Sequence, residues 1–346
     1  MHKLLDMAQA REFSDTMQLH ESLVELRQRE RSARGSMVWM RARGNEYLHR
    51  SSYDDRGRRK QTTLGPRTEE TEAMRTNFLS ARADVKSRLK KLEVKMRLQA
   101  ATNAARGIAR LPLVSARVIR AFDNAGIGSS RIKVVGTHAL YAYEAMAAAI
   151  FDSGLTSTED IDFLLDPRAP LRFVASEELS SETLLGILQS ADRSFEMTRQ
   201  TFRARNQDGF LVDIIQPERT PPWRKNAFEA ETTDLQPSPI AGLVWLENAP
   251  VVEQKVIDSR GFPVTMNVPD PRAFAIHKLW LSKQPYRASP KASRDRQQSF
   301  AVATLVMSEL KHLPFDGRTL RMMPREIVLE AIAAFRKLPL SLSSQI

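Results

Sequence analysis

Residues 157–165 of this chain read Ser157-Thr158-Glu159-Asp160-Ile161-Asp162-Phe163-Leu164-Leu165. On a β-strand alternate side chains point to the same face, so Asp160 and Asp162 would stand side by side while Ile161 turns toward the core. Two carboxylates held that close repel each other unless a cation lies between them. Mg²⁺ prefers oxygen ligands and fills its remaining positions with water and substrate phosphates. The pair predicts a phosphate-handling site, and the alternative is a solvated strand edge.

Two other segments favour the phosphate-handling site. Residues 131–137 predict a short apolar strand broken by Gly136, and residues 137–150 predict an alanine-rich helix. A strand, turn and helix of this kind aim backbone N–H groups and the Thr137 hydroxyl at a ligand, and helix N-termini favour anions. Residues 209–215 predict a hydrophobic strand with Asp213 in its middle. A lone carboxylate in such a strand is costly unless it is paired or bound to metal.

Together these segments resemble the DNA polymerase β-like nucleotidyltransferase superfamily. The motifs that carry the resemblance are Val134-Val135-Gly136-Thr137, Thr158-Glu159-Asp160-Ile161-Asp162 and Leu211-Val212-Asp213. The run Val-Gly-Thr-His-Ala-Leu-Tyr-Ala-Tyr-Glu-Ala at residues 135–145 is similar to a bacterial nucleotidyltransferase-fold branch of unsettled substrate. The resemblance to the superfamily core covers residues 130–300, and the closer branch shares the N-terminal extension.

The resemblance implies roles for five residues. In the superfamily a Gly-Ser or Gly-Gly turn holds the triphosphate, which assigns Gly136 and Thr137 to nucleotide binding. Three acids of the superfamily bind two metals, which makes Asp160, Asp162 and Asp213 the expected catalytic residues and the ligands of Mg²⁺ or Mn²⁺. The chain departs from the family pattern in carrying Thr137 where Ser is commoner. The interval from Gly136 to Asp160 is also longer than in the smallest members.

A later helical segment extends the resemblance. In related enzymes a Lys in a His-Lys-Leu setting faces the nucleotide phosphates, which assigns Lys278 to the triphosphate. A basic residue before Asp, here Arg294-Asp295, ties the helices to the site. The alternatives are a surface lysine at Lys278 and an ordinary helix salt bridge at Arg294 and Asp295. His138 is expected to cap or pack rather than to contact substrate.

Composition narrows the class of protein. At 346 residues the chain can bury a sizeable core and predicts two or three domains. It has no Cys, which excludes disulfides and thiolate metal sites, and its six His are scattered without metal-ligand spacing. The longest apolar run, residues 145–151, is shorter than the roughly 20 residues of a membrane span, and the N-terminus lacks a signal-peptide core. The expected partners therefore include no membrane, and the expected location is cytoplasmic.

Charge is distributed unevenly along the chain. Residues 1–132 hold 27 Lys and Arg against 15 Asp and Glu, whereas residues 133–346 hold 25 against 26. All of the net charge of +11 therefore belongs to the N-terminal part. Basic regions supply sequence-independent contacts to phosphates. The alternatives are a nucleic-acid partner bound through residues 1–132 and a solvated, arginine-rich helical surface or dimer contact.

The basic part predicts a helical entry over residues 3–33, then a β-hairpin over residues 36–53 that turns at Gly44-Asn45, then a third strand at residues 58–65. This pattern resembles, over a short length, the arm-type modules of some DNA recombinases. Its aromatic residues, Trp39, Tyr47 and Tyr53, either stack on bases or pack into a small hairpin core. Residues 68–99 predict a long helix with acids at its start and basic residues near its end, which matches the helix dipole and suits a coiled-coil arm or a bundle helix.

The C-terminal part predicts a proline-rich loop over residues 216–240, with Trp223-Arg224-Lys225 as a basic aromatic tip or as part of a connector. It also predicts a hairpin over residues 250–267 turning at Arg260-Gly261, and helices at 270–283, 290–312 and 324–337. The fold class is α+β, a nucleotidyltransferase-like mixed sheet flanked by helices with a basic N-terminal extension and a C-terminal helical segment. The expected domains are residues 1–128, 129–268 and 269–346.

The resemblance implies a metal-dependent enzyme that transfers a nucleoside monophosphate from an NTP to a hydroxyl acceptor, with RNA or protein as candidate acceptors. In this hypothesis Asp160 and Asp162 hold two Mg²⁺ ions and Asp213 binds the metal that activates the acceptor hydroxyl. Two alternatives stay open. The core could be inactive in a nucleic-acid-binding or regulatory protein, or the enzyme could move a phosphoryl or nucleotidyl group onto a small molecule such as an antibiotic. The toxic half of a toxin–antitoxin pair is one known use of the superfamily, and nothing in the sequence selects it.

Overall fold

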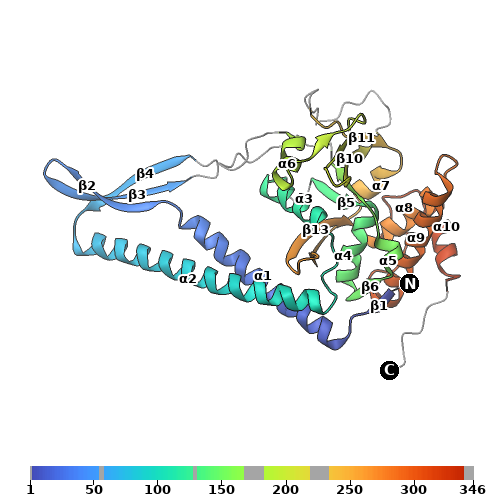
Figure 1. Ribbon diagram of the computed structural model, residues 1–346, viewed down its shortest axis with the longest axis horizontal. Coiled ribbons are helices and arrows are strands. Elements are labelled where there is room, and N and C mark those ends of the chain that lie inside the picture. The colour runs from blue at the N-terminus through green and yellow to red at the C-terminus, as the bar shows by residue number, and fades with distance from the viewer. Residues whose placement is uncertain (1, 54–57, 128–130, 167–182, 219–233, 339–346) are drawn as a thin grey trace.

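The computed structural model describes residues 2–53, 58–127, 131–166, 183–218 and 234–338. Figure 1 shows two parts, a mixed α/β core and a long helical arm that projects from it and carries a small sheet at its far end. Most of the loop predicted over residues 216–240, including Trp223-Arg224-Lys225, lies outside the described residues. None of the described helices has the length and hydrophobicity that a membrane span requires.

The core is built on a mixed sheet. Its strands follow the order β5 (Ile132–Val135), β7 (Asp160–Leu165), β10 (Leu211–Pro217), β9 (Arg203–Arg205) and β8 (Glu196–Met197), and β11 (Ser238–Ile240) also pairs with β10. The β7 and β10 strands are parallel, whereas β5 and β9 run antiparallel to their neighbours. A hairpin of β12 (Val251–Ile257) and β13 (Pro263–Pro269) packs beside β5.

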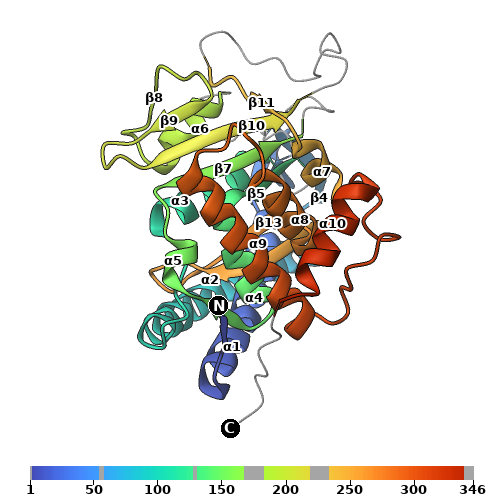
Figure 2. The ribbon, with the colours of Figure 1, turned by 90° about the vertical axis from the view of Figure 1, so that its right-hand side faces the viewer.

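Helices cover this sheet. The amphipathic α3 (Leu113–Asn124) packs with α6 (Leu184–Ala191), and one continuous hydrophobic core joins helices to strands. Figure 2 shows α8 (Pro271–Leu281), α9 (Ser289–Glu309) and α10 (Arg325–Phe335) grouped on one side of the core. On β5 the buried Lys133 ammonium donates to carbonyls of Leu246, Glu247 and Ala249, at the C-terminus of α7 (Leu243–Asn248), which satisfies both the charge and the helix end. The predicted α+β class, second hairpin and C-terminal helices are confirmed.

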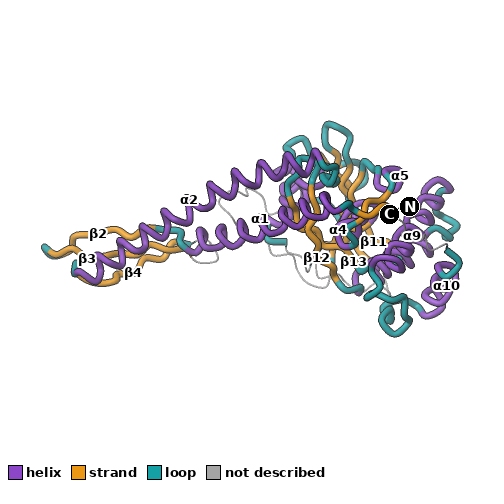
Figure 3. Tube along the Cα trace, turned by 90° about the horizontal axis from the view of Figure 1, so that it is seen from below, coloured by secondary structure: helices purple, strands orange, loops and turns teal. Residues whose placement is uncertain are grey.

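The arm consists of α1 (Met7–Ser32) and α2 (Glu69–Ala105), which lie side by side along their length (Figure 3). Leu23 and Leu26 of α1 pack against Leu89 and Met96 of α2. The sheet at its end contains β2 (Ser36–Ala42), β3 (Asn45–Tyr53) and β4 (Arg59–Pro66), as predicted, with the hairpin turn at residues 43–44. In this sheet the Arg67 guanidinium lies 5.2 Å from the Trp39 ring, whereas Tyr53 is 48% exposed.

The helix predicted over residues 137–150 is shorter than expected. A 3-10 turn, η1 (Gly136–His138), leads into α4 (Ala139–Met146), and the chain then forms β6 (Ala149–Phe151). Ala148 adopts a left-handed φ of 48°, which ends the helix. β6 pairs with β1 (His2–Leu4), so a distant strand overrides the helix propensity of the alanines. The boundary between residues 128 and 129 stays a prediction.

Candidate active site

Three carboxylates lie on two adjacent strands of the core. Asp160 and Asp162 are near the start of β7, and Asp213 is on β10. In the parallel register of these strands Asp213 lies beside Asp162, and Leu211 lies beside Asp160. Because residues paired in register point to the same side of a sheet, all three carboxylates share one face. The structure thus brings together the three acids that the sequence placed in separate segments.

Burial and the two neighbouring acids together shift the pKa of Asp162. Burial, followed by the negative charges of Asp160 and Asp213, raises the pKa of Asp162 to about 7, although Lys278 and Arg203 oppose the shift. A carboxyl group with that pKa is half protonated at neutral pH. Burial disfavours the charged form of Asp162 and the charges of Asp160 and Asp213 add to the shift, so a cation beside these carboxylates would favour the ionised form of Asp162.

Gly136 brings the backbone of the predicted turn against this face. It follows β5, whose Val135 pairs with Asp162, and its φ of 65° lies in the left-handed region. A Cβ atom at this position would lie 2.1 Å from Oδ2 of Asp162, well inside contact distance. Only glycine leaves room for the carboxylate beside the turn.

Asp213 already has a cationic partner. The guanidinium of Arg203, directly opposite on β9, donates from Nε to Oδ1 and from a terminal nitrogen to Oδ2, both at 2.6 Å. The Asp213 side chain is 8% exposed, so this bidentate pair is largely buried. Sequence reasoning missed Arg203. The available signal was a basic strand, Arg203-Ala204-Arg205, just before the strand that carries the acid.

Thr137 and Asp160 are also held by neighbours. The Thr137 hydroxyl accepts a hydrogen bond of 3.1 Å from Nε2 of Gln298 on α9, and the same amide donates to the carbonyl of Leu155. The Thr158 hydroxyl donates to Oδ1 of Asp160. Gln298 is fully buried and was not singled out from the sequence. It fixes the turn that carries Thr137.

Lys278 is buried on α8 rather than free at the surface. Its ammonium donates to Oδ1 of Asp295 at 2.6 Å, and Arg287 donates to Oδ2 of the same carboxylate at 2.7 Å. Its charge also acts on Asp162. The Arg294 side chain donates to the carbonyl of Ser157, just before β7, so Arg294 ties α9 to the strand of the acids.

His138 packs inside the core. Its Nε2 lies 2.7 Å from the Ser115 hydroxyl, and its ring contacts Tyr141 and Phe210. Burial lowers the pKa of His138 to about 4, although the charge of Asp160 opposes the shift. The imidazole is therefore neutral at physiological pH, and its side chain makes no capping hydrogen bond to α4.

The acidic face fits a divalent metal by its chemistry but not by its present arrangement. Carboxylate oxygens are the ligands that Mg²⁺ prefers, and Asp160, Asp162 and Asp213 share one face of the sheet. Yet within the described ranges no group of three His, Asp or Glu side chains is arranged to hold a metal ion. The guanidinium of Arg203 binds the two carboxylate oxygens of Asp213 that a metal would use. The role of Mg²⁺ or Mn²⁺ stays a prediction.

Comparison with known proteins identifies a family. A protein-family model described as nucleotidyltransferase matches residues 114–324, which include all three acids, the Gly136 turn and Lys278. The comparisons with curated proteins and with solved structures give no match.

Proposed function

The chain belongs to this nucleotidyltransferase family, and on that premise we propose that it transfers a nucleoside monophosphate from an NTP to a hydroxyl acceptor with Mg²⁺ or Mn²⁺ as cofactor. The superfamily expected from the sequence is thereby confirmed. One observation supports the specific reaction most strongly. Asp160, Asp162 and Asp213 share one face of the sheet, with the Gly136 backbone against Asp162.

The chain's own residues have distinct parts in this proposal. Asp160, Asp162 and Asp213 would hold the metal, which when bound neutralises charge on the attacking and leaving oxygens. Gly136 leaves its backbone exposed to an anion, and Thr137 offers a hydroxyl that Gln298 positions for the β and γ phosphates. Lys278 supplies positive charge next to this face, and Asp295 and the surrounding helices fix its position.

RNA is the acceptor that we favour. The basic surplus of the chain lies before residue 133, and much of it is on the arm. Basic surfaces raise the local concentration of polyanions and contact phosphates regardless of sequence. The arm would then hold the acceptor while the core carries out the transfer. We place the reaction in the cytoplasm, where the protein would bind its NTP substrate.

An inactive core is the second candidate, and Arg203 favours it. A guanidinium bound to the third acid by two hydrogen bonds takes the place of a metal and neutralises the charge of Asp213 without one. In this reading the protein binds nucleic acid through its arm, and the acidic face is a structural ion-pair site.

Labelling distinguishes the two candidates. The purified protein is incubated with each α-labelled NTP, Mg²⁺ or Mn²⁺, and total RNA or cell extract. The proposal predicts label on RNA from wild type and none from Asp160→Ala/Asp162→Ala. Glu159→Ala removes an exposed acid just before the same strand and should leave the yield unchanged. Label on protein would change the acceptor, and no label from a folded wild-type protein would favour the inactive core.

A further inference from the structure

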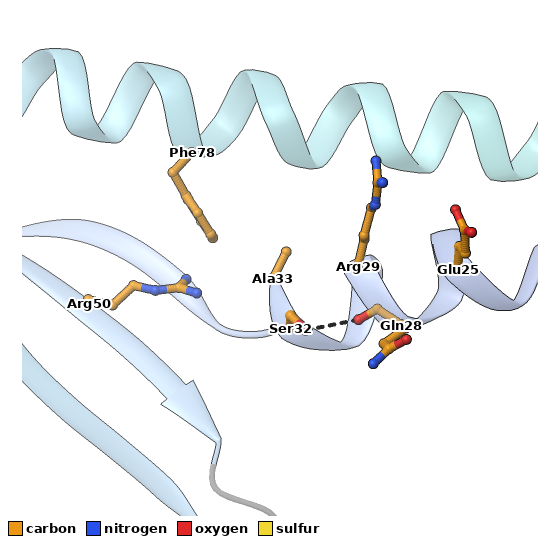
Figure 4. A pocket seen from close by; sticks show the side chains of 7 residues that line it. All are labelled: Glu25, Gln28, Arg29, Ser32, Ala33, Arg50 and Phe78. Carbon is orange, nitrogen blue, oxygen red and sulfur yellow. Dashed lines mark hydrogen bonds between the residues drawn. The ribbon is translucent and has the colours of Figure 1, made fainter. Parts of the chain in front are cut away.

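The arm contains a cavity that the proposed reaction does not use. It has a volume of about 690 Å³ and lies where α1, α2 and β3 meet. Its lining consists of Glu25, Gln28, Arg29, Ser32, Ala33, Arg50 and Phe78. Figure 4 shows Phe78 pointing from α2 into the gap, with Arg50 on one side of the ring and Ala33 on the other.

The cavity forms where the apolar seam of the arm stops. On α2 the positions that face α1 follow helical spacing from Leu89 through Val85 to the half-buried Phe78. Leu89 and Val85 pack against leucines of α1, whereas Phe78 lines the cavity together with Arg29 and Arg50. Leu26 is the last buried leucine of α1, and beyond it the wall is formed by polar and small residues.

The arginines at this point lack anionic partners. Nη1 of Arg50 is buried without a hydrogen-bond partner, and the guanidinium carbon lies 4.1 Å from the centre of the Phe78 ring. Arg82 donates to the carbonyl of Gly35. Within the described part of the chain, no carboxylate forms an ion pair with Arg29, Arg50 or Arg82. Arg29 and Arg82 are exposed and Arg50 is half-buried, but the buried Nη1 atom of Arg50 is a donor without an acceptor, which favours a ligand that supplies an anionic oxygen here.

A second basic cavity adjoins the first. It has a volume of about 350 Å³, shares Glu25 and Arg29 with the first cavity, and adds Arg88, Lys91 and Lys95 of α2. Glu25 is the acidic side chain of both linings, against four basic residues in the second. From Phe78 to Lys95 the helix rises by about 25 Å. Two anion-favouring cavities in a row suit a ligand with several phosphates better than a single small anion.

We propose that this track on the arm binds single-stranded nucleic acid, with one nucleotide in the larger cavity, its phosphate on Arg29 and Arg50 and its base near Phe78. Guanidinium groups match phosphate geometry, and an aromatic ring within a basic groove is typical of single-strand binding. The bases of a duplex are stacked and paired, so a duplex would present its phosphates to this open groove without bringing a base to Phe78. Binding of the strand does not depend on the proposed function. The identification of this strand as the acceptor of the transfer rests on the proposed function.

Binding of fluorescent oligouridylate and oligothymidylate to the full chain, without NTP or metal, tests the proposal. We expect Arg29→Ala/Arg50→Ala to weaken binding of the single strand about tenfold. The slope of the logarithm of the binding constant against the logarithm of the salt concentration should become shallower by about 1.4, the value for two lost phosphate contacts. Lys86→Ala/Lys90→Ala removes the same charge from the arm, but these exposed lysines line neither cavity. Its effect should be much smaller.

Phe78 tests the base contact. Phe78→Ala should weaken binding about tenfold, as expected for one lost stacking partner. If circular dichroism shows that this variant unfolds the arm, Phe78→Leu keeps an apolar side chain and still removes the ring. Equal losses in the two double variants, or tighter binding of a duplex of the same sequence than of either strand, would overturn the proposal. Tighter binding of the ribose or of the deoxyribose strand would support it and identify the polymer.

The two proposals fail separately. Asp160→Ala/Asp162→Ala should bind the single strand like wild type, because both positions are on the core rather than on the arm. If the arm variants bind normally while transfer still requires the acids, the track proposal is wrong and the nucleotidyltransferase proposal stands. If transfer is absent while the track binds the strand, the reverse holds.

Discussion

At the scale of single residues, Gly136 joins the nucleotide turn to the acidic face. We expect Gly136→Ala to lower transfer about 100-fold, because its Cβ would displace Asp162 and a misplacement of an ångström at a reacting centre has effects of that size. The left-handed backbone adds about 1–2 kcal/mol of strain. The measurement is the initial rate of label transfer together with thermal unfolding.

Gly154→Ala is the matched control for that substitution. Gly154 is in α5 (Ser153–Thr156), and a Cβ atom there would have no neighbouring atom within 4 Å, so both rate and stability should stay near wild type. A wild-type rate in Gly136→Ala would show that the turn tolerates a side chain, and the assignment of the turn to the nucleotide would fail.

The second prediction at this scale concerns Arg203 and the affinity of Asp213 for a divalent ion. Arg203→Ala leaves the buried carboxylate of Asp213 without its partner, which should destabilise the metal-free protein by about 3 kcal/mol. A divalent ion should then bind more tightly, because it no longer competes with the guanidinium. Mn²⁺ should therefore raise the melting temperature of this variant more than that of wild type.

The exposed Arg205 on the same strand provides the comparison for Arg203. Arg205→Ala removes a positive charge two residues away without touching Asp213, so its Mn²⁺-induced shift should match that of wild type. An identical shift in all three proteins would mean that Asp213 is not a metal ligand.

The residues that could be predicted are those whose chemistry is local in sequence. Asp160 and Asp162 sit two apart on one strand, and the Gly136-Thr137 turn directly follows another. Arg203 and Gln298 could not be found in this way. Arg203 meets Asp213 only through strand register, and Gln298 reaches Thr137 across 161 positions of sequence through the packing of α9.

At the scale of elements, α8 carries a histidine that makes stability depend on pH. Burial, followed by the charge of Lys278, lowers the pKa of His277 to about 3. The unfolded chain therefore binds a proton that the folded chain excludes, and stability is lost as the pH falls below 6.5 toward 3. By pH 5 this residue should account for about 2 kcal/mol of lost stability.

His277→Phe tests this expectation. The ring contacts Trp245 and Trp280, and its Nε2 is buried without a partner, so phenylalanine can fill the position without losing a hydrogen bond at that atom. Urea unfolding at pH 7 and pH 5 should show a smaller loss of stability in the variant. Parallel losses in both proteins would assign the acid sensitivity to other groups.

Elements with a strong local sequence pattern were predicted well. The helix predicted over residues 137–150 was wrong at its end, where pairing with a distant strand determines the structure. The start of the long α2 helix follows from Thr68 and the acids after it, although the helix runs on to Ala105 rather than ending near residue 99, and the hairpin at Arg260-Gly261 follows from its turn residues. The alanine-rich sequence leading to residue 149 predicts a helix, yet residues 149–151 form a strand because residues 2–4 lie beside them. A partner so distant in sequence leaves no local signal.

At the scale of the whole molecule, the junction of arm and core depends on the β12–β13 turn. Asn103 of α2 donates to the Gly261 carbonyl at 2.9 Å and also bonds to Thr16 of α1, so one side chain links both arm helices to the hairpin. Phe262 packs against the apolar cluster of the arm. The same few residues thus set the direction in which the arm leaves the core (Figure 1).

Gly261→Ala should loosen this junction. A Cβ there would lie 2.0 Å from the Ala100 carbonyl oxygen, which belongs to a helix backbone and cannot turn aside, so α2 itself must move. Gly44→Ala has a similar left-handed φ but no atom within 4 Å, so it isolates the backbone strain of about 1–2 kcal/mol from the clash. In small-angle scattering the first variant should broaden the distribution of long interatomic distances, and the second should not. If the acceptor must reach the acids from the arm, Gly261→Ala should also lower transfer to RNA while leaving single-strand binding intact; equal transfer in both variants would show that the arm's direction does not matter.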